Sequence, residues 1–503
     1  MSHLRGNISA NLLANVWATL LAIGLTPAYV ALLGIESYGL IGFYMSWIAI
    51  LGIIDTGIAT AALRETAWLR ERPQERARIP TLIRTLELIY WTIVVALGCI
   101  LFAAAWWFGD AWFSSVVLSP GLIRSALLLM VASLVLQMPS GLYVGGLMGL
   151  QHQIECSAFT AAFGTLRGVG ALAVLMAQPD IRMFFGWHIV VSALQTGVLR
   201  WRLMSHMTGH RPHYSHLVAC SVRSFAGQMS VVTALSLLMV QADKMILSRL
   251  ISLEAFGAYM LAWTAASGLS RLSTPLTHAF SPQFTALVAR NDCEGLSTRL
   301  RLASQLTGIL MLPPGVLLVI LGRPALFVWT GNGPVSDRAA PLLAVLAVGT
   351  VLTACSYPAL STLYSRGEMK PVIAVNVGAA LTLLPLMAMA ALSAGALGAA
   401  ACWTTYGLVT YVSYQAIALK MLPGAGLMAR IAADFLAPAA ASVAVVWVAS
   451  GLVPDVGGRL SAAAFLAIVL CLAWAAAVAV CRDLIKAVSS TFSWKPLAFP
   501  WSA

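Results

Sequence analysis

Apolar runs long enough to cross a lipid bilayer recur along the whole length of this chain of 503 residues. A helix needs about 20 apolar residues to cross the hydrocarbon core. No stretch between these runs is long enough to form a soluble domain. The composition agrees, since apolar residues make up 60% of the chain and charged residues only 10%. The sequence therefore predicts an all-α polytopic membrane protein.

The apolar runs divide into fourteen predicted transmembrane helices. Their approximate limits are 8–33, 38–63, 81–108, 121–148, 155–177, 183–199, 218–249, 255–289, 302–321, 340–364, 371–393, 396–419, 431–452 and 460–481. Lys and Arg residues concentrate in alternate loops, and these loops are the inner ones if the N-terminus is cytoplasmic. By the positive-inside rule, we predict that both chain ends lie in the cytoplasm.

One membrane pattern occurs twice in the chain. Segment 33–39 (LGIESYG) resembles segment 250–257 (LISLEAFG), and their acidic residues Glu36 and Glu254 are 254 − 36 = 218 positions apart. Such repeats are typical of carriers that bind substrate between two similar halves. Both glutamates are predicted to begin a helix, where a carboxylate suits the positive dipole end, rather than to act chemically.

The repeat predicts two six-helix lobes of parallel orientation, because an even number of spans returns each lobe to the cytoplasm. The predicted parts are 1–217 for the first lobe, 218–425 for the second lobe, and 426–503 for two extra helices and a cytoplasmic tail.

A polar stripe lies within the predicted span 255–289. It consists of Ser267, Arg271, Thr274, His278 and Ser281, at steps of four, three, four and three residues that keep one helix face. A cation inside a membrane helix is costly and usually functional. We predict that Arg271, with Ser267, Thr274 and His278, contacts an anionic substrate. The alternative is a structural Arg271 satisfied by carbonyls and an acid, with His278 as a packing residue.

Asp55 lies in the span that the repeat pairs with this one. We hypothesise that it faces Arg271 across the lobes and forms a pair that cargo or a proton breaks, which would make Asp55 a site of ion coupling. The alternative is a capping or turn role for the Asp55-Thr56-Gly57 segment.

Three further charged residues lie inside predicted spans. Arg167 sits among glycines that allow close helix approach, so it is either a buried structural cation or a cavity ligand. Adjacent residues do not face one another on a helix, so Asp243 and Lys244 are not expected to be partners. Lys244 is expected to reach the outer interface or bind substrate. Asp243 is expected to lock a neighbouring span or to gate.

Two basic segments lie in predicted inner loops. One inner loop could meet a pyrophosphate or anionic lipid headgroups, although topology alone explains its charge. It contains Arg64, Arg70, Arg72, Arg76 and Arg78. The histidines near 200–217, including His206, could form a metal tract, but a solvated linker between the lobes is favoured.

Six short strings carry a resemblance that covers about residues 7–425. They are Asn11, Leu33-Gly34-x-Glu36-x-Tyr38-Gly39, Asp55-Thr56-Gly57, Asp243-Lys244-Met245-Ile246-Leu247, Glu254-x-Phe256-Gly257-x-Tyr259 and Arg366-Gly367-Glu368-x-Lys370. In their order and spacing, the chain resembles the polysaccharide transporter family. These are the O-antigen-type lipid-linked oligosaccharide flippases of the multidrug/oligosaccharidyl-lipid/polysaccharide exporter superfamily.

The resemblance implies a V-shaped carrier of the bacterial inner membrane, in which the first, second, seventh and eighth spans line a central cavity. Its cargo would be a polyprenyl-pyrophosphate oligosaccharide for O-antigen, capsule or exopolysaccharide, turned over by alternating access without ATP. Implied partners are the bilayer, a polysaccharide polymerase or ligase, and a proton or sodium gradient. We expect no cofactor and no nucleic acid. We also expect no metal site, since none of the eight cysteines forms a C-x-x-C pair.

Three alternative functions stay open. A drug or cation exporter of the same superfamily would present acids to its substrate, whereas this chain offers Arg167, Lys244 and Arg271 against Asp55 and Asp243. A membrane glycosyltransferase or polymerase would need a large outward loop with acidic catalytic residues. A scaffold for a glycan-assembly complex would not need the polar stripe.

Overall fold

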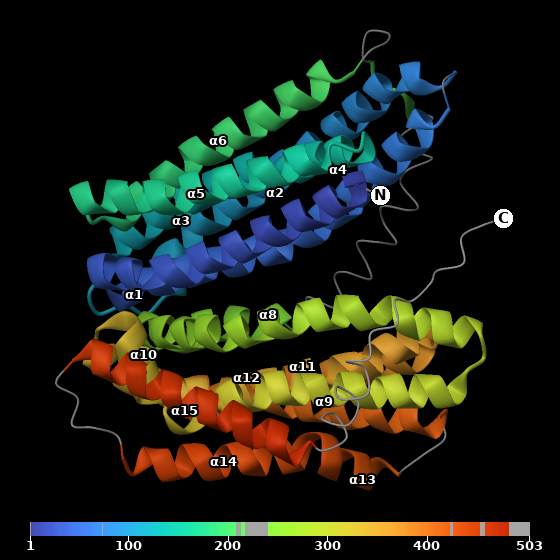
Figure 1. The fold of residues 1–503 in the computed structure, drawn as a ribbon. Helices are drawn as coiled ribbons and strands as arrows, with labels where there is room; N and C mark the ends of the chain where they lie inside the picture. The colour runs from blue at the N-terminus through green and yellow to red at the C-terminus, as the bar shows by residue number, and fades with distance from the viewer. Residues whose placement is uncertain are drawn as a thin grey trace. The chain divides into compact units, whose positions relative to one another are not determined.

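The computed structural model describes residues 2–72, 74–207, 213–216, 240–422, 426–452 and 458–481 (Figure 1). Within these ranges every regular element is a helix. Nine described helical segments are long and apolar enough to cross a membrane. The prediction of an all-α polytopic membrane protein is confirmed. Most of the predicted span 218–249 lies outside the described residues.

Two long helices each contain two predicted spans joined at a glycine. Helix α1 (Ser2–Arg70) is broken at Gly34, where φ is 79° and ψ is 169°. Helix α12 (Met369–Lys420) is broken at Gly395, where φ is 58° and ψ is −138°. Glycine adopts positive φ without the steric cost of a Cβ. In both helices the chain therefore changes direction at the glycine without an intervening loop.

The chain divides into two compact units. Unit 1 comprises Met1–Leu261 and Met387–Ala396, and unit 2 comprises Ala262–Leu386 and Leu397–Ala503. The unit boundary falls inside helix α8 (Leu253–Ala289). The lobe boundaries predicted from the repeat, at residues 217 and 425, stay predictions.

Unit 1 is a helical bundle. After α1 come the short helix η1 (Arg76–Arg78), α2 (Ile79–Trp112), α3 (Pro120–Gln137), α4 (Ser140–Gly149), α5 (Gln153–Ala177) and α6 (Ile181–Ser205), and residues 240–250 are also helical. Helix α1 packs on α4 and α5, while α3 packs on α2 and α6. The predicted span 121–148 is divided into α3 and α4 next to Pro139, whose ring lacks an N–H for the helical ladder.

Small residues bring α4 against α1. A Cβ added at Gly145 would lie 2.3 Å from the carbonyl oxygen of Ala59, and one at Gly149 would lie 2.7 Å from that of Leu63. Lipid chains are as apolar as leucine, so helices in a bilayer associate through such close packing rather than through release from water.

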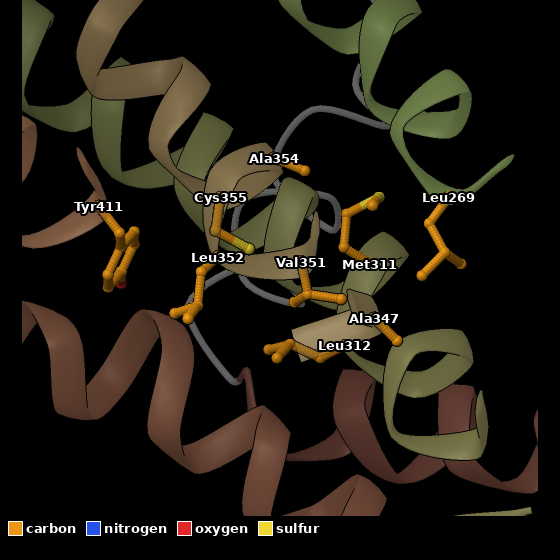
Figure 2. Close-up of a cluster of buried hydrophobic side chains, with 9 residues drawn as sticks. All are labelled: Leu269, Met311, Leu312, Ala347, Val351, Leu352, Ala354, Cys355 and Tyr411. Carbon is orange, nitrogen blue, oxygen red and sulfur yellow. The ribbon is translucent and has the colours of Figure 1, made fainter. Parts of the chain in front are cut away.

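Unit 2 is built around α9 and α11. Its further helices are α9 (Cys293–Ile320), α10 (Gly322–Thr330), α11 (Gly333–Ser365), α13 (Leu427–Ile431), the π-helical η2 (Ala432–Leu436), α14 (Ala437–Ser450) and α15 (Arg459–Val480), besides parts of α8 and α12. Figure 2 shows its buried cluster, to which α9 and α11 contribute most side chains. The cluster contains Leu269, Met311, Leu312, Ala347, Val351, Leu352, Ala354, Cys355 and Tyr411.

The two C-terminal helices are part of unit 2. Both α14 and α15 pack on α9 and on each other. A buried polar contact strengthens this attachment, since Gln305 Nε2 of α9 donates to Asp434 Oδ1 of η2 over 2.9 Å.

Candidate functional site

Asp55 lies inside a helix and ties three helices of unit 1 together. Helix α1 is uninterrupted from Gly34 to Arg70, so a capping or turn role for the Asp55 segment is wrong. The Tyr90 hydroxyl of α2 donates to Asp55 Oδ1 over 3.0 Å. On the other side, the carboxylate packs on Gly141 of α4, where an added Cβ would lie 1.8 Å from Oδ1.

Asp243 and Lys244 form a buried ion pair, contrary to the sequence prediction. Lys244 Nζ lies 2.9 Å from both Asp243 carboxylate oxygens, and each side chain is 1% exposed. The Cβ atoms of adjacent helical residues do point in different directions. The flexible four-carbon side chain of Lys244 nevertheless folds back toward Asp243. Its expected reach to the outer interface is also wrong. The Tyr259 hydroxyl of α8 donates to Asp243 over 2.5 Å, so Asp243 holds a neighbouring helix, as one of its readings predicted.

Arg167 connects α5 to α6. Its Nη2 donates to Gln195 Oε1 over 2.7 Å, while its Nε is buried without a hydrogen-bond partner among the described residues. The glycines around it do allow close approach, because the Tyr29 hydroxyl donates to the Gly168 carbonyl over 2.8 Å. A Cβ at Gly170 would lie 2.4 Å from the Trp187 ring. These contacts explain the glycines, whereas the choice between a structural cation and a cavity ligand for Arg167 stays a prediction.

The predicted polar stripe lies on a single continuous helix, α8, which runs through two prolines. Arg271, Thr274 and His278 are exposed, and Ser267 is half-buried. The hydroxyls bond within their own helix, since Ser267 donates to the Thr264 carbonyl over 3.1 Å and Thr274 to that of Ser270 over 3.3 Å. The hydroxyl hydrogens of Ser267 and Thr274 are therefore already bonded. The Arg271 guanidinium and the His278 imidazole are the groups that set this helix face apart. The role of the stripe stays a prediction.

Asp55 belongs to unit 1 and Arg271 to unit 2. Their pairing, and the roles of Asp55 and Asp243 in ion coupling or gating, therefore stay predictions.

Sequence reasoning missed a buried acidic centre in unit 1. Glu87 of α2 is 2% exposed and pairs with Arg84 at 2.7 Å and with Arg200 of α6 at 2.5 Å. The Tyr143 hydroxyl of α4 donates to the same carboxylate over 2.8 Å. The available signal was an acid within a predicted span, but its partners lie far away in sequence.

Glu36 does more than begin a helix. Its carboxylate accepts the backbone N–H groups of Val116, Val117 and Leu118 over 3.0 to 3.2 Å, and the Ser115 hydroxyl over 2.5 Å. It thereby holds the turn between α2 and α3. Its counterpart Glu254 lies in the first turn of α8, as predicted.

A second missed feature is a cavity of about 220 Å³ at one end of unit 1, here called the cation cavity. Its lining residues are Arg70, Arg76, Ile79, Leu150, His152, His206 and Met207. They come from the end of α1, from η1, from the start of α2, from the α4–α5 turn and from the residues that follow α6. The sequence indicated the arginines and His206 separately, but not that they meet.

A carboxylate lies beside the two histidines of this cavity. Ligand atoms of His152, Glu155 and His206 lie within 4.8 Å of one another, a spacing that a metal ion could bridge. However, Arg202 also pairs with Glu155, so the one carboxylate of this group already has a cationic partner. The positive surroundings disfavour a metal cation.

Comparison with known proteins places the chain in a family. A family described as "Polysaccharide biosynthesis protein" matches residues 4–288. The "Uncharacterized membrane protein EpsK" of Bacillus subtilis (strain 168) is 24% identical over 397 residues, which cover 74% of each chain.

Solved structures share the fold. "Lipid II flippase MurJ, inward closed conformation" matches with a TM-score of 0.75 and 13% identity, over 94% of this chain and 99% of that one. An inward-facing multidrug resistance MATE family transporter of the MOP superfamily matches with a TM-score of 0.65 and 12% identity, over 83% and 95%. At these identities the likeness shows the fold alone. Because the family match spans more than half of the sequence, the chain belongs to the polysaccharide biosynthesis protein family.

Proposed function

We propose that this protein is a flippase of the bacterial inner membrane that carries isoprenoid-pyrophosphate-linked oligosaccharide across the bilayer for surface polysaccharide synthesis. Both chain ends would be cytoplasmic, and turnover would proceed by alternating access without chemistry on the cargo. A polymerase or ligase would consume the cargo outside, and a proton or sodium gradient is a candidate driving force.

The polar face of α8 is the observation that carries the proposal. A diphosphate and a glycan cannot cross about 30 Å of hydrocarbon unshielded, so a carrier must present polar groups and positive charge along the way. Arg271, Thr274 and His278 provide such a face on a helix of 37 residues, and all three are exposed in the chain. Facing lipid, a guanidinium there would be costly. The face is therefore suited to a wet path for an anion.

The comparisons support the same choice. The family is one of polysaccharide biosynthesis. The solved structure with a TM-score of 0.75 is titled a lipid II flippase. Neither names the glycan of this chain.

A drug or cation exporter is the second candidate, because a MATE family transporter shares the fold. A cationic substrate would need acids that are not already neutralised. Asp243 is paired with Lys244, and Glu87 is paired with Arg84 and Arg200. Asp55 accepts its hydrogen bond from the uncharged Tyr90 and would be available to such a substrate. Against this acid, Arg271 on α8 supports anionic cargo.

The other two alternatives find less support. The described segment between α2 and α3, residues 113–119, is short and held by Glu36, whereas a glycosyltransferase or polymerase would need a large outward loop with acids. A scaffold would have no use for the polar face of α8.

The test is complementation of a deletion strain with Arg271→Ala, Arg271→Lys and the control Leu272→Ala, which changes an exposed neighbour on the same helix. We expect Arg271→Ala to abolish export of surface glycan, Arg271→Lys to retain part of it, and Leu272→Ala to behave as wild type. Equal amounts of each variant in the membrane fraction must be shown.

Reconstituted vesicles separate the candidates. Wild-type protein should turn over polyprenyl-pyrophosphate sugar, and Arg271→Ala should not. Efflux of a cationic dye that is indifferent to added polyprenyl-pyrophosphate sugar would favour the drug exporter. Normal glycan export by Arg271→Ala would favour the scaffold.

A further inference from the structure

The cation cavity brings together four basic side chains from three chain turns. Arg70 ends α1, Arg76 begins η1, His152 lies in the α4–α5 turn, and His206 follows α6. The cavity lies wholly within unit 1. If the predicted orientation holds, this end of the unit faces the cytoplasm.

One guanidinium nitrogen in this wall is not satisfied by the protein. Arg70 Nη1 is buried and has no hydrogen-bond partner among the described residues. A buried charged donor without an acceptor is costly. Arg76 lines the same cavity, and its Nε donates to the backbone carbonyl of Arg70 over 2.5 Å. Two guanidinium groups are thereby fixed at one cavity.

The nearby acid does not neutralise this charge. Glu155 is engaged by Arg202, and His206 Nε2 lies 3.1 Å from it. The rings of His152 and His206 stack with centroids 3.9 Å apart, so protonation of both would be unfavourable without an anion. The cavity therefore has an excess of donors over acceptors.

We propose that the cation cavity binds a phosphate-bearing anion, and in particular a diphosphate. Planar guanidinium groups match phosphate oxygens in pairs. A volume of about 220 Å³ suits a small anion, since pockets for drug-sized ligands begin at about 300 Å³. As the entry point for the diphosphate of a lipid-linked glycan, the site rests on the proposed function; anion binding itself does not.

The experiment measures binding of inorganic pyrophosphate by calorimetry to the full-length protein in phosphatidylcholine nanodiscs. The variants are Arg70→Gln and Arg76→Gln, and the matched control is Arg78→Gln, an exposed arginine outside the cavity that carries the same charge change. We expect the two cavity variants to bind about 10- to 100-fold more weakly than wild type. The control should bind within about twofold of wild type.

A second arm separates free diphosphate from lipid headgroups. If headgroups occupy the cavity, phosphatidic acid in the nanodiscs should weaken pyrophosphate binding by wild type but not by Arg70→Gln. If phosphatidic acid does not compete, the cavity is assigned to free diphosphate or to the diphosphate of the cargo. Both results support an anion site.

Two outcomes would overturn the inference. In the first, Arg70→Gln and Arg76→Gln bind pyrophosphate as well as Arg78→Gln. In the second, Zn²⁺ binds instead, through His152, and Arg70→Gln leaves that binding unchanged. Arg76→Gln keeps the test decisive if Arg70→Gln does not fold, because Arg76 is exposed.

Failure of this inference can be told apart from failure of the proposed function. If the protein moves lipid-linked glycan but the cavity variants bind pyrophosphate like wild type, the proposed site is wrong and the proposed function stands. If pyrophosphate binding depends on the cavity arginines but the protein moves no lipid-linked glycan, the proposed site stands and the proposed function is wrong.

Discussion

At the scale of single residues, the structure replaces several isolated charges with local networks. Lys244 and Asp243 neutralise one another in the interior, and Glu87 collects two arginines and a tyrosine. A sequence shows that such residues are costly within an apolar span. It does not show which way a flexible side chain bends, which is why the Lys244 prediction failed while Asp243 was correctly expected to hold a neighbouring helix.

We predict that Lys244→Met destabilises the protein by about 3–5 kcal/mol, because it leaves the Asp243 carboxylate buried without its counter-charge. The double variant with Asp243→Asn should recover most of this loss. The loss of stability is measured by thermal unfolding in detergent, with tryptophan fluorescence as the signal. Lys370→Met serves as the control because Lys370 is exposed. A stable Lys244→Met protein that fails only in transport would instead favour the substrate-binding reading of Lys244.

At the scale of helices, hydrophobic length predicted the elements well. The spans 8–33 and 38–63 correspond to the two parts of α1, and 371–393 and 396–419 to those of α12. Apolar length is set by the bilayer and is therefore visible in sequence. The cation cavity was not visible, because its walls come from turns that only packing brings together.

We predict that Gly145→Ala weakens the contact between α4 and α1 and destabilises the protein by about 1–3 kcal/mol. The added methyl would meet the backbone oxygen of Ala59, which cannot rotate away. Gly164→Ala is the control, since no atom lies within 4 Å of its added Cβ. It should be neutral or stabilising by up to about 1 kcal/mol. Equal melting temperatures for the two variants would contradict this account of helix packing.

At the scale of the whole molecule, the internal repeat predicts a carrier and the family is one of polysaccharide biosynthesis, whereas the Asp55–Arg271 pair awaits its test. We predict that Asp55→Arg and Arg271→Asp each reduce glycan export by about tenfold or more, equivalent to ~1.4 kcal/mol. If the two side chains pair, the double reversal should restore part of the activity. Asp55 also accepts from Tyr90, so Tyr90→Phe should be included as the control for local damage. A double variant no better than either single one would exclude direct pairing.

The hydrogen bonds between Glu36 and the turn between α2 and α3 have a mechanical consequence. Glu36 follows the glycine break in α1 by two residues and holds three successive backbone N–H groups of that turn. If the two parts of α1 change their angle at Gly34, the second part must pull the connected ends of α2 and α3 along with it or release all three bonds. Bending at one residue would thus be converted into a concerted displacement of three helices.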